Sequence, residues 1–545
     1  MRLPAFLIGS LLLFSVANGQ KTTANNGVNR PKLVVGIMID QMRWDYLYRF
    51  QDRFGPDGFR RLLNQGFSCE NTFIPYTPTY TAVGHTSVYT GSVPAITGII
   101  GNNWYRRDIK RNWYCTDDST VAGVGSTSSA GKMSPRNMWT TTMTDELRLA
   151  TNFKSKTIGV ALKDRGAILP AGHSANAAYW FDNATGGWIS STYYMTELPA
   201  WVQQLNAKKL ADQYMAKDWN TLYPIETYTQ STGDVKAYEG KIRGEDNSFP
   251  HTTSQIAEKD KYEAFRTTPG GNTLTFDMAR AAIEGEQLGQ RGATDFLAVS
   301  FSSTDYIGHA FGPNSIEVED CYLRYDRELA AFLKYLDTKI GAGQYLLFLT
   351  ADHAVAHVPG FMKENKLPGG TFDDEDVRKW INTNAEKKFG VKSAIEKVIN
   401  YQLFVDFPAL AAANVDETVF KKWVVNELRT HPAIMSAFDL HELPGTPLPA
   451  RIKEMVSNGY NHKLSGDIQF IFMPQWFDGG PTGTTHGAWN PYDSHIPLLW
   501  YGWKIKQGKT NRETHMTDIA ATVSALLHIQ MPNGCVGEVI EEITK

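Results

Sequence analysis

Three aspartates and three histidines lie at or near the ends of predicted strands, and such side chains can bind metal ions. Each aspartate follows a continuous apolar run, 33–39, 296–301 or 345–350, of the kind that forms a strand buried on both faces. Because ligands of open α/β sheets bind at the carboxyl ends of the strands, we expect these side chains to converge. The candidate metal ligands are Asp40, Asp305, His309, Asp352, His353 and His486.

The mixture of imidazoles and carboxylates among these six residues favours zinc. Calcium and magnesium sites use oxygen ligands almost alone, whereas zinc accepts both nitrogen and oxygen. Asp305 and His309 are four residues apart, so on a helical turn they share one face. Six ligands suit two sites better than one, and we expect two zinc ions per chain, with manganese as the alternative. Two metal ions about 4 Å apart suit displacement at phosphorus.

The segment 77–91 is predicted to be a loop that leads into a short helix beginning at Thr81. Pro78 ends any earlier regular structure, and residues 82–89 can form about two helical turns. The first N–H groups of a helix have no internal partner and attract an oxyanion such as phosphate or sulfate. Thr81 is therefore either an N-cap or a nucleophile directed at a bound oxyanion. His85, four residues after Thr81, either contacts the site or is a packed histidine, and we expect the second.

Residues 156–162 are predicted to form a strand that runs into Lys163, Asp164 and Arg165. Side chains two apart on an extended chain point to the same side, so Lys163 and Arg165 would face one site. They are either a solvated charge pair or two cations that bind phosphoryl oxygens. A phosphate monoester is a dianion and a diester a monoanion, so such cations favour a monoester substrate.

Strands and amphipathic helices alternate along most of the chain. This alternation predicts a doubly wound α/β fold, with a mostly parallel central sheet flanked by helices. Helices are expected at 58–65, 134–150, 274–288, 315–340 and 518–529, and a further short strand at 496–501. We expect a single catalytic domain over residues 20–545.

Two regions interrupt the alternation and are predicted to be cap insertions over the active edge, around 166–271 and 354–485. The first is rich in Tyr, Trp, Asn, Thr and Gly, and it could instead be an ordinary surface excursion. In the second, helices are expected near 394–401 and 415–430, followed by a strand at 468–473.

The N-terminal segment has the composition of a cleaved export signal. Residues 1–19 carry one positive charge, Arg2, before an apolar core, and they end in small residues. No later segment offers a long uncharged apolar run, so we expect no membrane span and a periplasmic or secreted protein. The formal net charge is −3 over 545 residues, so the chain has no excess of positive charge that would attract nucleic acid.

The four cysteines permit two disulfides in an exported protein. We expect the pairs Cys69–Cys115 and Cys321–Cys535, although the sequence alone leaves three pairings open. None of the four has the spacing of a cysteine metal site.

The motifs TYTAVGHTS, TGIIGN, TDYIGHAFG, TADH and THG resemble those of the alkaline phosphatase superfamily, over nearly all of the chain after the signal. The nearest likeness is to the phosphate-irrepressible (PafA-type) bacterial alkaline phosphatases, to which segment 162–173 is especially similar. The resemblance implies that Thr81 is the nucleophile and a metal contact, and that Asn102 donates to a phosphoryl oxygen. It implies one zinc held by Asp40, Asp352 and His353, and another held by Asp305, His309 and His486.

The same resemblance implies an exported phosphomonoesterase that forms and then hydrolyses a phosphothreonine. Its partners would be phosphate monoesters and inorganic phosphate, as product and inhibitor, with a monomer favoured. Sulfatases of the superfamily carry Cys or Ser in a C/S-x-P-x-R context, which the segment after Thr81 lacks. Magnesium-bearing members use further carboxylates that have no clear equivalent here, and Lys163 would take the place of that charge. A phosphodiesterase, or a non-catalytic protein that captures phosphate or a phosphoglycan, are the alternatives.

Overall fold

A sheet of eleven strands runs through the molecule, and the strands at its centre are parallel. β1 (Leu33–Ile39) lies between β9 (Asp295–Phe301) and β10 (Tyr345–Thr350), and β6 (Thr157–Ala161) and β7 (Ala177–Asp182) follow beyond β9. Every residue of these five strands is buried. Unbroken apolar runs form such strands because both faces of the sheet are covered.

Antiparallel strands extend the sheet at both edges. β18 (Leu498–Gly502) pairs with β10, and β2 (Phe67–Phe73) pairs in turn with β18 and with the parallel β19 (Gly508–His515). At the other edge, β8 (Gly187–Ser191) pairs with β7. The parallel centre is therefore protected from edge pairing by the rest of the sheet.

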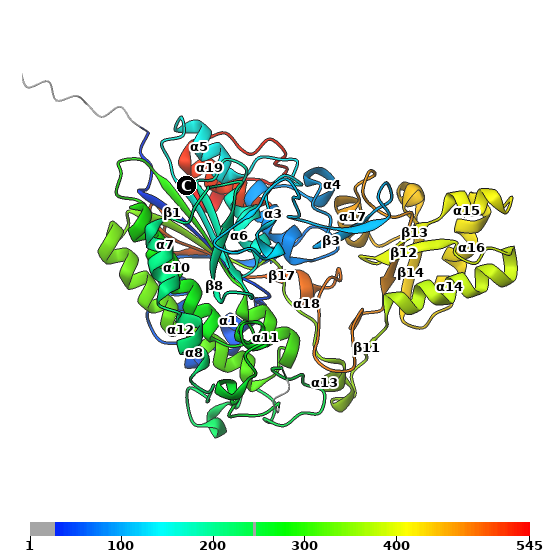
Figure 1. Ribbon diagram of the computed structural model, residues 1–545, viewed down its shortest axis with the longest axis horizontal. Helices are drawn as coiled ribbons and strands as arrows, with labels where there is room; N and C mark the ends of the chain where they lie inside the picture. The colour runs from blue at the N-terminus through cyan, green and yellow to red at the C-terminus, as the bar shows by residue number, and fades with distance from the viewer. Residues whose placement is uncertain (1–27, 244–246, 545) are drawn as a thin grey trace, which may run out of the picture.

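Helices cover both faces of this sheet (Figure 1). One layer contains α3 (Thr81–Thr90), α6 (Asp164–Ala171) and α19 (Asp518–Leu527), and the other contains α10 (Gly270–Glu286) and α12 (Ile316–Leu336). The predicted doubly wound α/β fold is confirmed.

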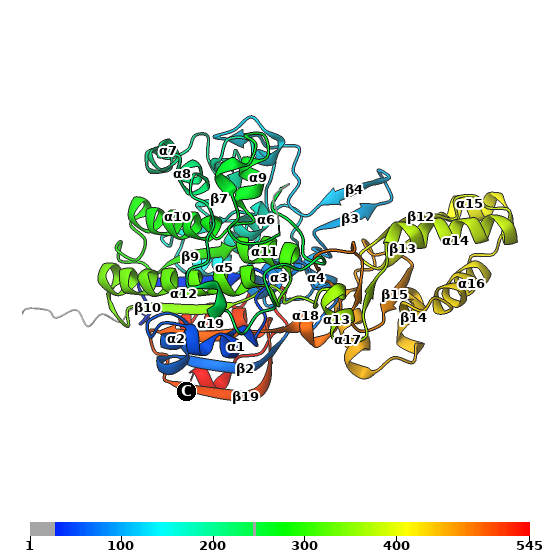
Figure 2. The same ribbon diagram turned by 90° about the horizontal axis from the view of Figure 1, so that it is seen from below.

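A second, smaller sheet stands apart from the first in both views (Figures 1 and 2). Its strands are β12 (Ile395–Ile399), β13 (Gln402–Val405), β15 (Ile468–Phe472) and β14 (Ile434–Asp439), in that spatial order. It packs its own apolar core against helices that include α14 (Asp374–Phe389) and α16 (Glu417–Arg429). All of this lies within the region 354–485. The region 166–271, by contrast, begins with α6, β7 and β8, which belong to the main sheet and its helices.

The computed structural model describes residues 28–243 and 247–544. The export signal predicted for residues 1–19 lies outside the described residues. Within the described ranges, no helix is both long enough and apolar enough to cross a membrane.

Two predicted helices differ from the structure. Segment 394–401 is a hairpin, because Asn400 and Tyr401 both adopt positive φ and form the two-residue turn between β12 and β13. The helix predicted over 134–150 is α5 (Met143–Ala150). It begins late because Thr142 and Asp145 form a reciprocal capping box.

The predicted disulfides are wrong, since all four cysteines are free in the part of the chain that the structure describes. Cys69 and Cys321 lie in the main core, whereas Cys115 lies in a separate apolar cluster with Trp104. The even number of cysteines and the predicted export of the protein suggested that they pair. A disulfide also needs two Cα atoms within about 7 Å of each other, and the sequence does not show this distance.

Close packing of α6 on β6 generates a test of the fold. A methyl group on Gly159 of β6 would lie 2.1 Å from the carbonyl oxygen of Ala167. Gly159→Ala should therefore destabilise the protein by about 1–3 kcal/mol, the usual cost of overpacking. The measurement is the urea-unfolding midpoint. Gly480→Ala is the matched control, because a methyl group there meets no atom within 4 Å; equal midpoints for both variants would contradict the close contact.

Candidate metal centre and active site

Four adjacent parallel strands deliver polar side chains to one edge of the main sheet. Asp40 follows β1, Asp352 follows β10 and Lys163 follows β6, while Asp305 lies in the first turn of α11 (Ser303–Phe311), directly after β9. The strand order β10-β1-β9-β6 places these ends side by side. The convergence predicted from the apolar runs is thus explained by the topology, at the edge where such sheets bind ligands.

The first group of potential metal ligands contains Asp40, Asp352 and His353, whose ligand atoms lie within 4.8 Å of one another. His353 Nε2 is 3.5 Å from Asp40 Oδ1 and 3.4 Å from Asp352 Oδ2. All three side chains are fully buried. This is the same trio that the resemblance assigns to one metal ion.

The second group contains Asp305, His353 and His486, also within 4.8 Å of one another. His309 lies beside it, with Nε2 3.1 Å from Asp305 Oδ1, while His486 Nε2 is 3.8 Å from that same oxygen. The rings of His353 and His486 stack at 3.4 Å. The structure thus brings all six predicted ligands together, and His353 belongs to both groups.

Hydrogen bonds to backbone carbonyls orient the three imidazoles. Nδ1 of His309 lies 2.7 Å from a carbonyl oxygen, Nδ1 of His353 3.0 Å, and Nδ1 of His486 2.6 Å. A carbonyl can only accept, so each Nδ1 donates, and each Nε2 is left to coordinate. Metal-binding histidines are commonly held in this way.

The carboxylates fit a bound cation. Asp40 Oδ1 and Asp352 Oδ2 are buried and have no hydrogen-bond partner among the described residues. Burial, followed by the neighbouring charges of Asp305 and Asp352, raises the pKa of Asp40 well above its ordinary value. Buried polar atoms of this kind need a partner, and a metal ion would supply one.

Lys163 lies between the two groups of ligands. Its Nζ donates to Asp40 Oδ2 at 2.7 Å and to Asp305 Oδ2 at 2.5 Å. Burial would lower the pKa of Lys163, but the charges of Asp305 and Asp40 outweigh it and raise the pKa. A fixed positive charge therefore joins the two groups, on the opposite carboxylate oxygens from those that face the histidines.

The backbone that carries Lys163 and Arg165 differs from the extended conformation predicted for this segment. β6 ends at Ala161 and α6 begins at Asp164, so the two cations occupy a turn and a helix. Arg165 Nη1 donates to Tyr114 Oη at 3.0 Å, and that hydroxyl donates to Asp164 Oδ1 at 2.8 Å. Nε of Arg165 is buried without a hydrogen-bond partner among the described residues.

Thr81 is the first residue of α3, and its Oγ1 lies 3.4 Å from His353 Nε2. The N-cap position belongs to Tyr80, so the N-cap interpretation of Thr81 is wrong. Asn102 Oδ1 accepts the N–H of Ala82 at 2.9 Å, which leaves the amide hydrogens of Asn102 to donate elsewhere. The hydroxyl and the amide therefore flank the N-terminus of the same helix.

Two further residues at this edge were not singled out as site residues from the sequence. His85 is fully buried, as a packed histidine should be, yet its Nδ1 lies 2.9 Å from the Thr81 carbonyl oxygen and 3.3 Å from Asp352 Oδ2. Gln41 donates from Nε2 to Asp305 Oδ1 at 2.7 Å. The available signal was adjacency, since Gln41 follows Asp40 and His85 lies one turn after Thr81.

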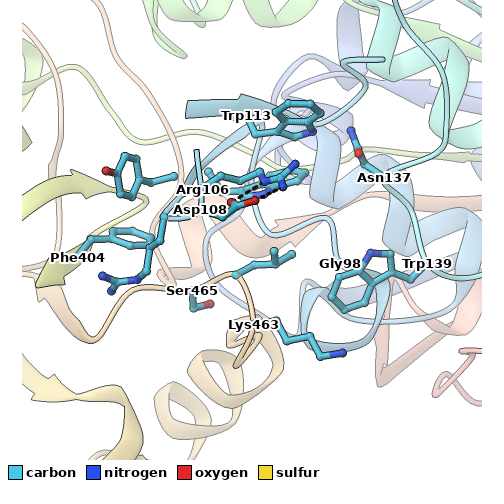
Figure 3. Close-up of a pocket in the computed structure, with 13 residues that line it drawn as sticks. Gly98, Arg106, Asp108, Trp113, Asn137, Trp139, Phe404, Lys463 and Ser465 are labelled. Atoms are coloured by element: carbon cyan, nitrogen blue, oxygen red, sulfur yellow. Dashed lines mark hydrogen bonds and ion pairs between the residues drawn. The ribbon is translucent and has the colours of Figure 1, made fainter. Parts of the chain in front are cut away.

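A separate pocket of about 410 Å³ is lined by residues of segments 98–108, 113–139 and 463–465 together with Phe404 (Figure 3). Its lining includes Trp104, Trp113, Trp139 and Lys463, and none of the predicted site residues. The candidate active site is therefore identified by the converging carboxylates and imidazoles and not by this pocket.

Comparisons with known proteins identify the family. The sequence matches the family described as type I phosphodiesterase / nucleotide pyrophosphatase over residues 34–493. It is 52% identical to alkaline phosphatase PhoV of Synechococcus elongatus, over 100% of both chains. It is 51% identical to alkaline phosphatase PafA of Elizabethkingia meningoseptica, over 99% of this chain and 98% of that one.

The fold gives the same result. The crystal structure of wild-type alkaline phosphatase PafA superposes with a TM-score of 0.92 at 50% identity, covering 95% of this chain and 100% of that one. Both comparisons cover nearly the whole chain. The chain therefore belongs to the alkaline phosphatase superfamily and is an enzyme of its alkaline phosphatase group.

Proposed function

We propose that this alkaline phosphatase is an exported, zinc-dependent phosphate monoester hydrolase that acts through a phosphothreonine at residue 81. One observation carries the proposal: the buried hydroxyl of Thr81, at a helix N-terminus, lies 3.4 Å from the histidine shared by both ligand groups. A hydroxyl in that place can reach an oxyanion bound between the helix and the metal centre.

Two zinc ions would be held by the chain. Asp40, Asp352 and His353 would bind the one nearer Thr81, and the ligands of the other would be Asp305, His309 and His486. The mixed nitrogen and oxygen donors and the unpartnered carboxylate oxygens support zinc at this place. When bound, zinc would lower the pKa of a hydroxyl and offset charge on the phosphoryl and leaving oxygens.

The residues of the chain would divide the reaction between them. Oγ1 of Thr81 would lose its proton and attack phosphorus, so a bond from Oγ1 to phosphorus forms while the bond to the ester oxygen breaks, and that oxygen leaves as an alcohol after gaining a proton. Water would then lose a proton and attack the same phosphorus, which breaks the bond to Oγ1. Thr81 regains its proton, and the inorganic phosphate released competes with substrate as an inhibitor. Asn102 and Arg165 would hold phosphoryl oxygens, and Lys163 would hold Asp40 and Asp305 while adding positive charge.

Two features support this division of roles. The name of one solved PafA variant records replacement of a threonine, an asparagine, a lysine and an arginine, the same residue types as the four proposed here. Arg165 is also pre-oriented by Tyr114, which reduces the entropy lost when a guanidinium grips two oxygens. We further propose that residues 354–485 form a cap, that residues 1–19 direct export, and that the protein is a monomer.

A phosphodiesterase is the second candidate, favoured by the description of the family that the sequence matches. The two activities make different demands on charge, because a diester is a monoanion with one non-bridging oxygen replaced. Comparing one monoester with one diester substrate therefore distinguishes them.

Removal of metal should weaken the fold as well as abolish hydrolysis. Zinc at about 100 times its dissociation constant should add about 2.7 kcal/mol to the free energy of unfolding, since binding favours the folded state. His353→Ala and His309→Ala should each lose part of this gain, because each histidine is a proposed ligand of one of the two zinc ions. Melting temperatures with and without zinc give the measurement. Asp478→Asn, in a more exposed acidic trio, is the control.

Substitution of Thr81 tests the nucleophile. Thr81→Ala should lower kcat by about 1,000-fold or more while zinc content stays the same, and Thr81→Ser should retain much of the activity. Acid quenching followed by peptide mass spectrometry should find phosphate on residue 81 of the wild type. Phosphate on another residue, or full activity of the alanine variant, would refute the assignment.

Substitution of the two cations tests the monoester preference. Arg165→Ala should lower monoester kcat/KM by about 10–100-fold, because a charged hydrogen bond contributes about 1.5–3 kcal/mol, and should leave zinc bound. Lys163→Ala should cost more and should also release zinc, since it leaves Asp40 and Asp305 without their shared cation. Diester hydrolysis should fall far less in the arginine variant. Equal losses on both substrates would favour the phosphodiesterase instead.

A further inference from the structure

We propose that Gln41 is a positioning residue that holds both groups of metal ligands in register. The inference rests on the proposed two-metal function and adds a residue that touches neither substrate nor metal. Gln41 is 2% exposed and immediately follows Asp40. From that place its backbone contacts a carboxylate of one group and its side chain contacts a carboxylate of the other.

The backbone contact orients Asp352. The N–H of Gln41 donates to Asp352 Oδ1 at 3.2 Å, and the N–H of His353 donates to the same oxygen at 3.0 Å. With Oδ1 occupied, Oδ2 is the oxygen that faces the histidines, 3.4 Å from His353 Nε2 and 3.3 Å from His85 Nδ1. The peptide group of Gln41 therefore helps to select which oxygen of Asp352 is presented to a metal.

The side-chain contact orients Asp305. Gln41 Nε2 donates to Asp305 Oδ1 at 2.7 Å, while Lys163 Nζ holds Oδ2 of the same carboxylate. Asp305 Oδ1 is also the oxygen closest to His309 and His486. The amide therefore restrains the one oxygen of Asp305 that faces the second group of ligands.

Making both contacts requires an unusual backbone. Gln41 has φ of 66°, in the left-handed region where residues other than glycine are rare. Such a conformation is strained and persists where the surroundings determine it, commonly at functional sites. In this conformation the peptide N–H of Gln41 is directed at Asp352 and its side chain is directed at Asp305.

The neighbouring helix is shaped to admit the amide. Gly308 lies in α11 between Asp305 and His309, and a methyl group there would lie 1.9 Å from Gln41 Oε1. An alanine at this position would favour the helix by propensity, so the glycine serves the contact and not the helix. The amide of Gln41 therefore occupies the space that a side chain at position 308 would fill.

The test measures zinc affinity rather than activity alone. Gln41→Gly removes the side chain but suits the left-handed backbone and keeps the N–H donor to Asp352. We expect zinc affinity at the Asp305, His309 and His486 position to fall about 10–100-fold, as for other residues that orient ligands. Affinity at the other position should stay close to the wild-type value. Competition with a chromogenic chelator should then show one weakened and one unchanged zinc ion, and cobalt substitution should change one absorption band.

A second variant, Gly308→Ala, tests the same contact from the other side. On its own it should displace the Gln41 amide and lower the zinc affinity at the Asp305, His309 and His486 position. Combined with Gln41→Gly it should cause no further loss, because the group that it displaces is gone. Gln287→Gly is the matched control, since Gln287 is an exposed glutamine with φ of 54° at the end of α10.

The outcomes separate this inference from the proposed function. If the wild type binds no zinc, the two-zinc function fails and this inference fails with it. If the wild type binds two zinc ions and Gln41→Gly binds both as tightly, the inference alone is overturned. Additive losses in the double variant would also overturn it, because they would show that Gly308 acts on the site independently of Gln41.

Discussion

Repulsion among buried carboxylates is the constraint around which this structure is built. Asp40, Asp305 and Asp352 are each at most 2% exposed, and the topology of the sheet places them at the ends of three adjacent strands. Three such charges cannot be buried together without compensation. Lys163 offsets part of the charge from one side, and the imidazoles and any bound cations must offset the rest from the other.

The groups that offset these charges also orient the potential metal ligands. Lys163 holds one oxygen on each of two aspartates, and backbone carbonyls take Nδ1 of all three histidines. What remains is the Nε2 atom of each histidine and the carboxylate oxygens that face these atoms. Removing any holding group would leave a buried charge unpaired, which costs more than the contact itself contributed.

The sequence allowed the centre of the fold and the ligand set to be predicted, because both depend on local signals. Unbroken apolar runs identified β1, β9 and β10, and the polar residues just beyond them identified Asp40, Asp305 and Asp352. The hairpin at 395–405 was missed because its signal is a pair of positive φ angles at Asn400 and Tyr401, residues that are not glycine. The disulfides were wrong because pairing depends on distances between segments, which spacing along the chain does not contain.

The four free cysteines also bear on how the folded chain reacts with oxidants. Burial raises the pKa of Cys69 and of Cys115 to about 12, and those of Cys321 and Cys535 are raised by burial as well. Thiol–disulfide exchange proceeds through the thiolate, so these side chains are poor partners for oxidants and for one another. The packing that stabilises the fold therefore also protects its thiols, for as long as the chain stays folded.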